Sequence, residues 1–245
     1  MKRIILFIFI LVFTSTLIST GLYIKNPTDM ERRIYDLVHK QADIHSFKEA
    51  KRILTEYDIV SFHQLPKDVL IDTKLDDTRF SKLTFYKIPK RDLYRKIYLN
   101  QRITDFYSLP QNQKFILFFG KEYYYICLNE KVLKSLFDLK DVLEVNGYNS
   151  RGIQVISGYR HPSRNDAVGG ATNSMHLYGN ALDIRVGDIN RDTKADTLDK
   201  ELVYSILNNT LIGNKGGLGF YPGTMVLHMD VRGTRARWDT YKRKI

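Results

Sequence analysis

The sequence of 245 residues contains a single cysteine, Cys127. One thiol excludes a disulfide within the chain and any metal site built from several cysteines. Because no cysteine follows the apolar N-terminal stretch, the sequence also argues against a lipoprotein anchor. In its context "YYYICLN", we interpret Cys127 as a small apolar residue of the core.

Several motifs of common enzyme classes are also missing. The sequence has no G-x-S-x-G elbow, no phosphate-binding loop and no dinucleotide fingerprint. Ser157 and Ser174 therefore have no serine-hydrolase context. We find no internal repeat and no low-complexity linker, so the length suggests one modest domain with accessory segments, or two small domains.

Acidic residues are in the minority, with 27 Asp and Glu against 38 Lys and Arg, a net charge of +11. This excess predicts an anionic partner such as a nucleic acid, an anionic lipid or an anionic polymer. The segment from Arg232 to Ile245 is especially basic, and we take the Arg232 guanidinium as a candidate partner for a substrate carboxylate. We interpret residues 242–244 as a solvated tail.

The N-terminus has the composition of an export segment. Lys2 and Arg3 precede the uncharged run Ile4–Ile24, which is long enough to cross a bilayer as a helix. The densest apolar part, Ile4–Phe13, has the length of a signal-peptide core. We therefore predict that residues 1–26 are a cleaved signal peptide or a retained signal-anchor helix. The rest of the chain is then periplasmic or in the cell envelope, anchored in the inner membrane by residues 4–24 if they are retained. This location, together with the lack of a nucleic-acid motif, argues against a nucleic-acid partner.

Residues 27–127 form a predicted accessory region. Apolar spacing predicts helices over residues 27–60, which are either a spacer or partner-binding segment or a surface helix of the main domain. The aromatic stretches favour strands over residues 114–119 and 123–128, and the tyrosine run is more typical of half-buried sheet than of a ligand surface.

From residue 128 to 241 the patterns are those of a compact α+β domain, a small mixed or antiparallel sheet with flanking helices. Helical spacing from Val132 to Leu143 ends at Asn146-Gly147, and "GIQVISGYR", "ALDIRV" and a last strand "MVLHMDV" follow, with a helix in "TLDKELVYSILNN". We expect "GGLGFYPG" to be a turn-rich approach to the last strand.

Three side chains of this domain form a candidate metal site. Strand alternation brings Asp183 and His228 to one side of the sheet, and His176 lies in a loop just before Asp183. Two imidazoles and a carboxylate suit zinc with one position left for water. Asp230 is a candidate general base, or alternatively an acceptor that orients a ligand, and Arg160 is a candidate stabiliser of the oxyanion.

The segments "SGYRHPSRN", "GGATNSMHLYGNALDI" and "GGLGFYPGTMVLHMDVRGTRARW" resemble the zinc peptidases of bacterial cell walls. This family includes D-alanyl-D-alanine carboxypeptidases, vancomycin-resistance dipeptidases and murein endopeptidase K, and shares its metal-site design with hedgehog domains. The pattern S-x-H-x-x-G-x-A-x-D falls on residues 174–183, the third ligand falls on His228 and the family arginine on Arg160. The ending at Arg237-Trp238 is most similar to the murein endopeptidase K branch.

The resemblance implies one Zn²⁺, held by His176, Asp183 and His228, and hydrolysis of bonds involving D-amino acids in peptidoglycan stem peptides or cross-links. Ser174, Tyr159 and Arg232 are the candidate substrate contacts, and His161 is more simply an exposed loop residue. The dipeptidase branch carries a glutamate base where this chain has Met225. Three functions therefore stay open: a murein endopeptidase, a D-Ala-D-Ala carboxypeptidase, and an inactive zinc-containing module that binds the cell wall or a protein.

Overall fold

A computed structural model of the chain describes residues 27–67, 69, 80–108 and 121–239. The described residues fall into two compact units, one of residues 27–41 and 121, the other of residues 42–108 and 122–239. The first unit contains α2 (Pro27–Val38). Among the described residues, no helix has both the length and the apolarity that crossing a bilayer requires. The predicted export segment, residues 1–26, lies outside the described residues.

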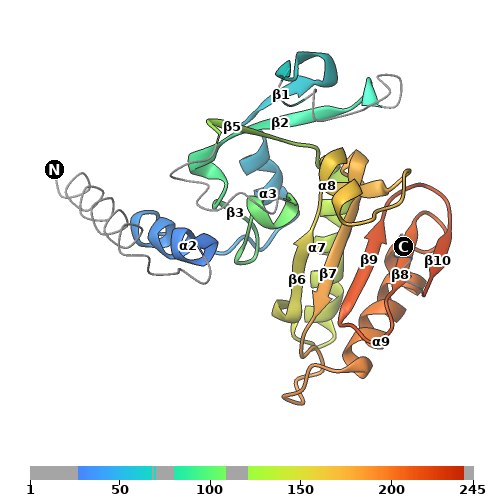
Figure 1. Ribbon diagram of the computed structural model, residues 1–245. Helices are drawn as coiled ribbons and strands as arrows, with labels where there is room; N and C mark the ends of the chain where they lie inside the picture. Colours follow the sequence, from blue (N-terminus) through green and yellow to red (C-terminus); the bar gives the residue numbers. More distant parts are fainter. Residues whose placement is uncertain (1–26, 68, 70–79, 109–120, 240–245) are drawn as a thin grey trace, which may run out of the picture. The chain divides into compact units, whose positions relative to one another are not determined.

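The larger unit is built around a five-stranded sheet with the strand order β10-β8-β9-β7-β6 (Figure 1). Neighbouring strands are antiparallel except for β8 and β10, which are parallel. The sheet is therefore mixed, as the sequence predicts. Its strands are β6 (Ile153–Ser157), β7 (Ala181–Val186), β8 (Gly217–Phe220), β9 (Val226–Asp230) and β10 (Ala236–Trp238).

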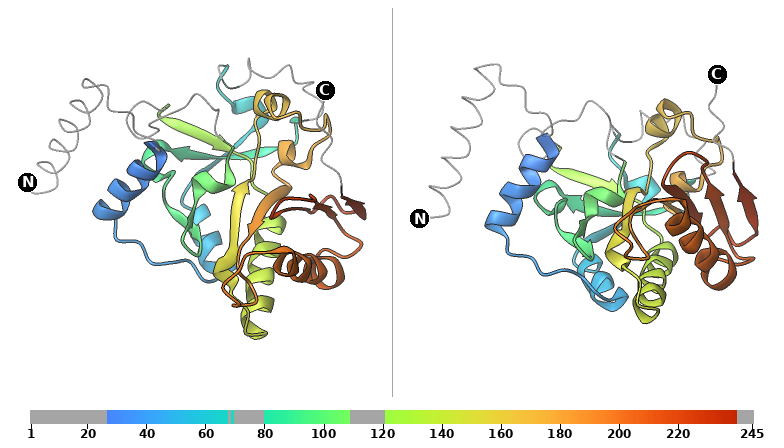
Figure 2. Two further views of the ribbon diagram at one scale, coloured as in Figure 1. Left: turned by 60° about the horizontal axis from the view of Figure 1, so that its bottom comes forward. Right: turned by 90° about the horizontal axis from the view of Figure 1, so that it is seen from below.

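Two helices, α7 (Glu130–Val145) and α9 (Thr197–Ile206), lie on one face of this sheet (Figures 1 and 2). The α7 helix begins where the Asn129 side chain accepts from the Lys131 amide, and ends before Gly147, whose φ of 78° only glycine adopts easily. Its apolar side chains recur at helical spacing and are fully buried. They are Val132, Leu133, Leu136, Phe137, Leu139 and Leu143.

A second, three-stranded sheet precedes the main one and has the antiparallel order β1-β2-β5. Its strands are β1 (Asp58–Ser61), β2 (Thr84–Pro89) and β5 (Tyr123–Ile126). A two-stranded sheet and short 3₁₀ turns lie between β1 and β5 in the sequence. The helix α3 precedes β1 and packs next to α7 through the rings of Phe47 and Phe137. These elements are α3 (Phe47–Leu54), η1 (Phe62–Gln64), η2 (Lys90–Asp92), β3 (Lys96–Tyr98), β4 (Gln101–Arg102) and η3 (Ile103–Phe106).

The remaining connections are η4 (Ser150–Gly152), α8 (Pro162–Ala167), η5 (Met175–Tyr178) and the π-helical turn η6 (Leu207–Leu211). The turn η5 immediately precedes β7 and ends at Gly179. It carries the central part of the sequence motif to the start of a core strand.

Several predicted elements are confirmed, among them α7, α9, β6, β7, β9 and the strand at 123–126. The prediction of helix over residues 27–60 is confirmed for α2 and α3 but wrong at residues 58–60, which belong to β1. The predicted strand at 114–119 lies outside the described residues. Cys127 is 5% exposed, and burial raises the pKa of its thiol to about 12, so it is the inert core residue expected.

Two strands were missed. The stretch "GGLGFYPG" contains β8 instead of only a turn, and β9 is not the last strand because β10 follows it. A side chain at Gly219 would collide with the Trp238 indole, so the glycine allows β10 to lie close beside β8. The close approach of β10 to β8 depends on tertiary packing, which the glycine-rich sequence alone does not indicate.

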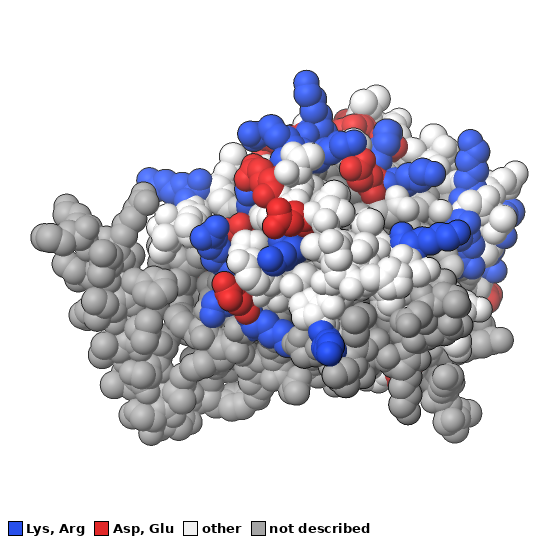
Figure 3. All heavy atoms as spheres, turned by 90° about the horizontal axis from the view of Figure 1, so that it is seen from above, with Lys and Arg blue, Asp and Glu red and all other residues white. Residues whose placement is uncertain are grey.

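The surface seen from the side of β1 and β2 is shown in Figure 3. Lys and Arg side chains are interspersed there with Asp and Glu side chains. On this face positive and negative side chains are therefore mixed, which is typical of a solvated surface.

Candidate metal centre

His176, Asp183 and His228 come together in a buried cluster. His176 Nε2 lies 3.2 Å from both Asp183 Oδ1 and His228 Nδ1, and the last two atoms are 3.0 Å apart. Three potential ligand atoms thus form a nearly equilateral triangle. In a tetrahedral zinc site with bonds of about 2.0–2.1 Å, ligand atoms lie roughly 3.3 Å from one another, so the cluster has the dimensions that zinc requires.

The strand register accounts for two of these positions. Asp183 on β7 and His228 on β9 are directly opposite each other in the antiparallel pair. Cross-strand partners project from the same face of a sheet, so the two side chains meet without any loop movement. The expectation that "ALDIRV" and "LHMD" bring these residues together is confirmed.

His176 reaches the same place from the turn η5, which is closed tightly against β7. Gly179 ends the turn with a φ of +63°, and a side chain there would collide with the backbone of Cys127. The Gly179 carbonyl accepts from the Asn129 amide at 3.0 Å, and Asn129 and Asn180 are joined side chain to side chain at 2.8 Å. The connection from β5 to α7 therefore fixes the turn that presents His176.

The outer nitrogen of each histidine has a fixed acceptor. His176 Nδ1 lies 2.7 Å from the Gly158 carbonyl, and His228 Nε2 lies 3.0 Å from Asp230 Oδ2. Because a carbonyl and a carboxylate only accept, these nitrogens carry the protons. The lone pairs of His176 Nε2 and His228 Nδ1 then point toward Asp183, which is the arrangement of metal-binding histidines.

The protonation tendencies of the cluster follow from burial and mutual contacts. Burial lowers the pKa of His176, which favours the neutral imidazole that a metal needs. Burial would raise the pKa of Asp183, but interactions with His176 and His228 outweigh burial and hold this pKa well below its usual value. For His228 burial is outweighed by hydrogen bonds to Asp183 and Asp230, which raise its pKa. A cation would therefore displace a proton from His228.

Asp230 lies behind His228 and is wholly enclosed. Its Oδ1 accepts from the Gly217 amide at 2.9 Å and from Arg232 Nε at 2.8 Å, while Oδ2 accepts from Arg232 Nη2 at 2.5 Å. Burial would raise the pKa of Asp230, but the bonds from His228 and Arg232 outweigh it and lower the pKa far below the ordinary value. Such a carboxylate is a poor proton acceptor. The geometry favours the alternative, in which Asp230 orients His228.

Arg160 lies on the other side of the cluster, against Asp183. Its Nη2 donates to Asp183 Oδ2 in a close ion pair, and its Nε donates to Ser157 Oγ at 2.9 Å. The two oxygens of Asp183 thus have separate tasks, since Oδ1 faces the histidines and Oδ2 faces the guanidinium.

The proposed substrate contacts have different surroundings. The interpretation of Tyr159 as a substrate contact is not supported: it is 5% exposed, and its ring packs against Phe85 and Tyr107. Ser174 begins the turn η5 and is half-buried, and Arg232 is an exposed residue whose guanidinium is paired to Asp230. The His161 ring contacts Ser163 Oγ and the Val69 carbonyl.

Sequence reasoning missed the carbonyl of Gly158 and the hydroxyl of Ser157, which hold His176 and Arg160. Both belong to the "SGYR" segment, in which the sequence motif points to Tyr159 and Arg160 and not to these two groups. A backbone acceptor carries no side-chain signal, so only the position of the segment next to the cluster could have pointed to it.

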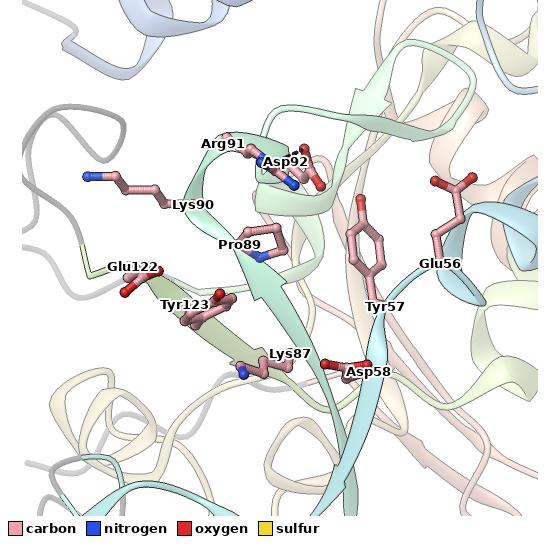
Figure 4. A pocket seen from close by; sticks show the side chains of 10 residues that line it. All are labelled: Glu56, Tyr57, Asp58, Lys87, Pro89, Lys90, Arg91, Asp92, Glu122 and Tyr123. Carbon is pink, nitrogen blue, oxygen red and sulfur yellow. Dashed lines mark ion pairs between the residues drawn. The ribbon is translucent and has the colours of Figure 1, made fainter.

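A separate cavity of about 480 Å³ lies in the accessory region (Figure 4). Two tyrosines and charged side chains of both signs line it, and Lys87 Nζ lies 4.2 Å from the centre of the Tyr123 ring. None of the cluster residues belongs to its lining. The lining residues are Glu56, Tyr57, Asp58, Lys87, Pro89, Lys90, Arg91, Asp92, Glu122 and Tyr123.

Comparison with known proteins gives one match. Residues 124–210 match the family described as Peptidase M15. The matched segment contains His176 and Asp183 and ends before His228. No curated protein and no solved structure shows a significant match.

Proposed function

We propose, from the match of residues 124–210 to the Peptidase M15 family, that the chain is a zinc-dependent peptidase that hydrolyses bonds involving D-amino acids in peptidoglycan. The observation that carries the proposal is the buried triangle of His176, Asp183 and His228, of which the first two residues lie in the segment that matches this family. The M15 peptidases are zinc-dependent, and the donor set of two neutral imidazoles and one carboxylate leaves a fourth position for water or substrate.

The roles of the surrounding side chains follow from their contacts. Bound zinc supplies a Lewis acid that polarises the scissile carbonyl and activates the attacking water. Gly158 and Asp230 accept hydrogen bonds from the outer nitrogens of the two histidines, which turns the inner nitrogens toward Asp183. Arg160 fixes the Asp183 carboxylate and supplies positive charge beside the carbonyl oxygen, where negative charge develops. Asp230 is unsuited to the role of base, and Met225 provides no carboxylate at the position where the dipeptidase branch has one.

Within this class we favour a murein endopeptidase over a D-Ala-D-Ala carboxypeptidase, on the similarity of "GGLGFYP" and Arg237-Trp238 to the endopeptidase K branch. Peptidoglycan is the proposed partner, and the net charge of +11 suits its acidic stem peptides. We place the enzyme outside the cytoplasm, in the periplasm or cell envelope, held in the membrane by residues 4–24 if these are retained. A nucleic acid is not part of the proposal.

Digestion of purified, cross-linked muropeptides tests this function. The wild-type enzyme should split cross-links in the presence of zinc and lose this activity after chelation, and the products are identified by mass. His176→Ala and Asp183→Ala each remove one ligand and should lower hydrolysis to background, while His45→Ala, at an exposed histidine far from the cluster in sequence, should not.

The product masses separate the alternatives. Loss of one terminal alanine with intact cross-links identifies a carboxypeptidase. Binding to isolated sacculi with zinc retained and no released peptide identifies the inactive module. Hydrolysis that persists in both ligand variants contradicts the assignment of the site.

A further inference from the structure

A short segment of the accessory region, Phe106–Tyr107–Ser108, runs alongside the loop that follows β6. We call this segment the strap. The amide of Tyr159 donates to the Phe106 carbonyl at 2.9 Å, and the Ser108 amide donates to the Tyr159 carbonyl at 2.9 Å. Tyr107 and Tyr159 form a parallel bridge between them. The strap therefore continues the sheet beside residues 157–160, the loop that contacts the metal cluster.

The fit between strap and loop depends on Gly158. A Cβ added to Gly158 would collide with the backbone of Phe106 at its carbonyl. The Tyr107 and Tyr159 rings stack with centroids 5.9 Å apart, and Phe106 is fully buried. Earlier in the chain, on β4, the Gln101 side chain donates to the Ile153 carbonyl at 2.8 Å and accepts from the Val155 amide at 2.5 Å. Backbone bonds thus hold the strap beside Tyr159, and Gln101 holds the segment before it against β6.

A line of side-chain contacts leads from the strap to a metal ligand. Ser108 Oγ lies 2.9 Å from Ser157 Oγ, which accepts from Arg160 Nε at 2.9 Å. Arg160 in turn pairs through Nη2 with Asp183 Oδ2. Because a guanidinium only donates, Ser157 is held as an acceptor on one side and shares a hydroxyl proton with Ser108 on the other. The Ser157 hydroxyl therefore links Ser108 to the Arg160 guanidinium.

The same loop also holds the second ligand. The Gly158 carbonyl accepts from His176 Nδ1 at 2.7 Å, and the Arg160 amide donates to the His176 carbonyl at 3.1 Å. Both His176 and Asp183 therefore depend on residues 157–160, which pack against the strap. A ligand held away from its best position by a fraction of an ångström binds its metal less tightly.

We propose that the strap is part of the metal site and that Ser108 is a positioning residue, which acts through Ser157 and Arg160 on Asp183. The inference rests on the proposed function in assigning zinc to the cluster. It gives the accessory region a role that the family match at residues 124–210 does not include. The segments outside the matched domain then contribute to metal affinity and to the placement of the catalytic arginine.

The test compares Ser108→Ala with two variants in the full-length protein. Ser108→Thr keeps the hydroxyl, and Ser135→Ala removes a hydroxyl that donates within α7, to the Lys131 carbonyl. Zinc affinity is measured by competition with a chromophoric chelator, a readout that does not require activity. Removing an outer partner of a metal ligand costs roughly 10–100-fold in affinity, and Ser108 lies further out, so we expect the lower end, about tenfold weaker binding for Ser108→Ala. Ser108→Thr and Ser135→Ala should bind zinc like the wild type.

Kinetics at saturating zinc give a second readout. Loss of the Ser108 hydroxyl should lower kcat through Arg160 and leave KM nearly unchanged. Wild-type zinc affinity together with wild-type kcat in a folded Ser108→Ala protein would overturn the proposal, as would equal weakening in Ser108→Thr. If the wild type binds zinc but cleaves no muropeptide, the proposed function fails, whereas the zinc affinities still decide the role of the strap.

Discussion

At the scale of single residues, Asp230 gives the sharpest prediction, because its two candidate roles have different consequences. If Asp230 orients His228, Asp230→Asn should weaken zinc binding about 10–100-fold and regain most of its hydrolysis when zinc is saturating. A general base would show the reverse, with unchanged zinc affinity and lost activity at saturation. The enclosed, doubly paired carboxylate favours the first outcome.

Zinc titration followed by muropeptide hydrolysis at each concentration measures both properties. Asp196→Asn is a suitable control, since this residue caps α9 with its side chain and asparagine caps a helix equally well. A variant that binds zinc normally and stays inactive would assign the base to Asp230 after all.

Asp199 allows a prediction about pH, at a site remote in sequence from the metal ligands. Its side chain is fully buried and accepts from the amides of Ile189, Asn190 and Asp196 at 2.8–3.0 Å. Burial would raise the pKa of Asp199, but these backbone donors outweigh it and lower the pKa. A carboxyl with a lowered folded pKa stabilises the protein fully above its unfolded pKa of about 3.9, and this contribution is lost as the pH falls through the folded value.

The replacement Asp199→Asn puts an amide among three donors, and we expect it to lower the free energy of unfolding by about 1–3 kcal/mol at pH 7. The difference from the wild type should shrink below pH 4. Urea unfolding at several pH values measures it, with Asp138→Asn on the surface of α7 as control, where loss of the Lys134 pair should cost about 0.5 kcal/mol or less. A constant difference at all pH values would contradict the ionised state of Asp199.

At the scale of elements, the turn η5 depends on a glycine for two separate reasons that can be distinguished. Gly179 and Gly213 both have positive φ, +63° and +50°, but a side chain at Gly213 meets open space whereas one at Gly179 meets the Cys127 backbone. Gly213→Ala should therefore cost only the left-handed backbone term of about 1–2 kcal/mol. Gly179→Ala should cost a further 1–3 kcal/mol or so from overpacking.

Thermal and urea unfolding of the two variants measure this difference. Gly179→Ala should also weaken zinc binding, because the displaced turn carries His176. Equal destabilisation by both substitutions would mean that the connection from β5 to α7 yields easily, and that it does not fix the turn.

The elements that the sequence predicts well are those with a strong local pattern. The apolar spacing of α7 and the alternation of Leu182 and Ile184 on β7 mark their own structure, and the strand faces of β7 and β9 place Asp183 beside His228. By contrast, β8 is rich in glycine, and β10 has three residues whose pairing depends on Gly219. The contact between Ser108 and Ser157 could not be predicted from the sequence either, since the two residues are 49 positions apart and meet through tertiary packing.

At the scale of the whole molecule, the metal is expected to contribute to stability, because the buried cluster places two imidazole nitrogens and a carboxylate oxygen within 3.2 Å of one another. Without a cation these acceptors repel each other or must bind a proton. A ligand that binds only the folded state stabilises it by about 2.7 kcal/mol at a concentration 100 times its Kd. For a chain of this size that corresponds to a rise in Tm of roughly 5–10 °C.

Zinc added to the chelated wild-type protein should therefore raise its Tm, and the same addition should leave His176→Ala unchanged, since one corner of the triangle is lost. Differential scanning fluorimetry measures the shift, with His45→Ala expected to respond like the wild type because its histidine lies outside the cluster. Magnesium should have little effect on either protein, because imidazole nitrogens suit zinc and magnesium prefers oxygen ligands. A zinc response in His176→Ala as large as in the wild type would place the ion elsewhere, and the arrangement of β7, β9 and η5 around these three side chains would then need another explanation.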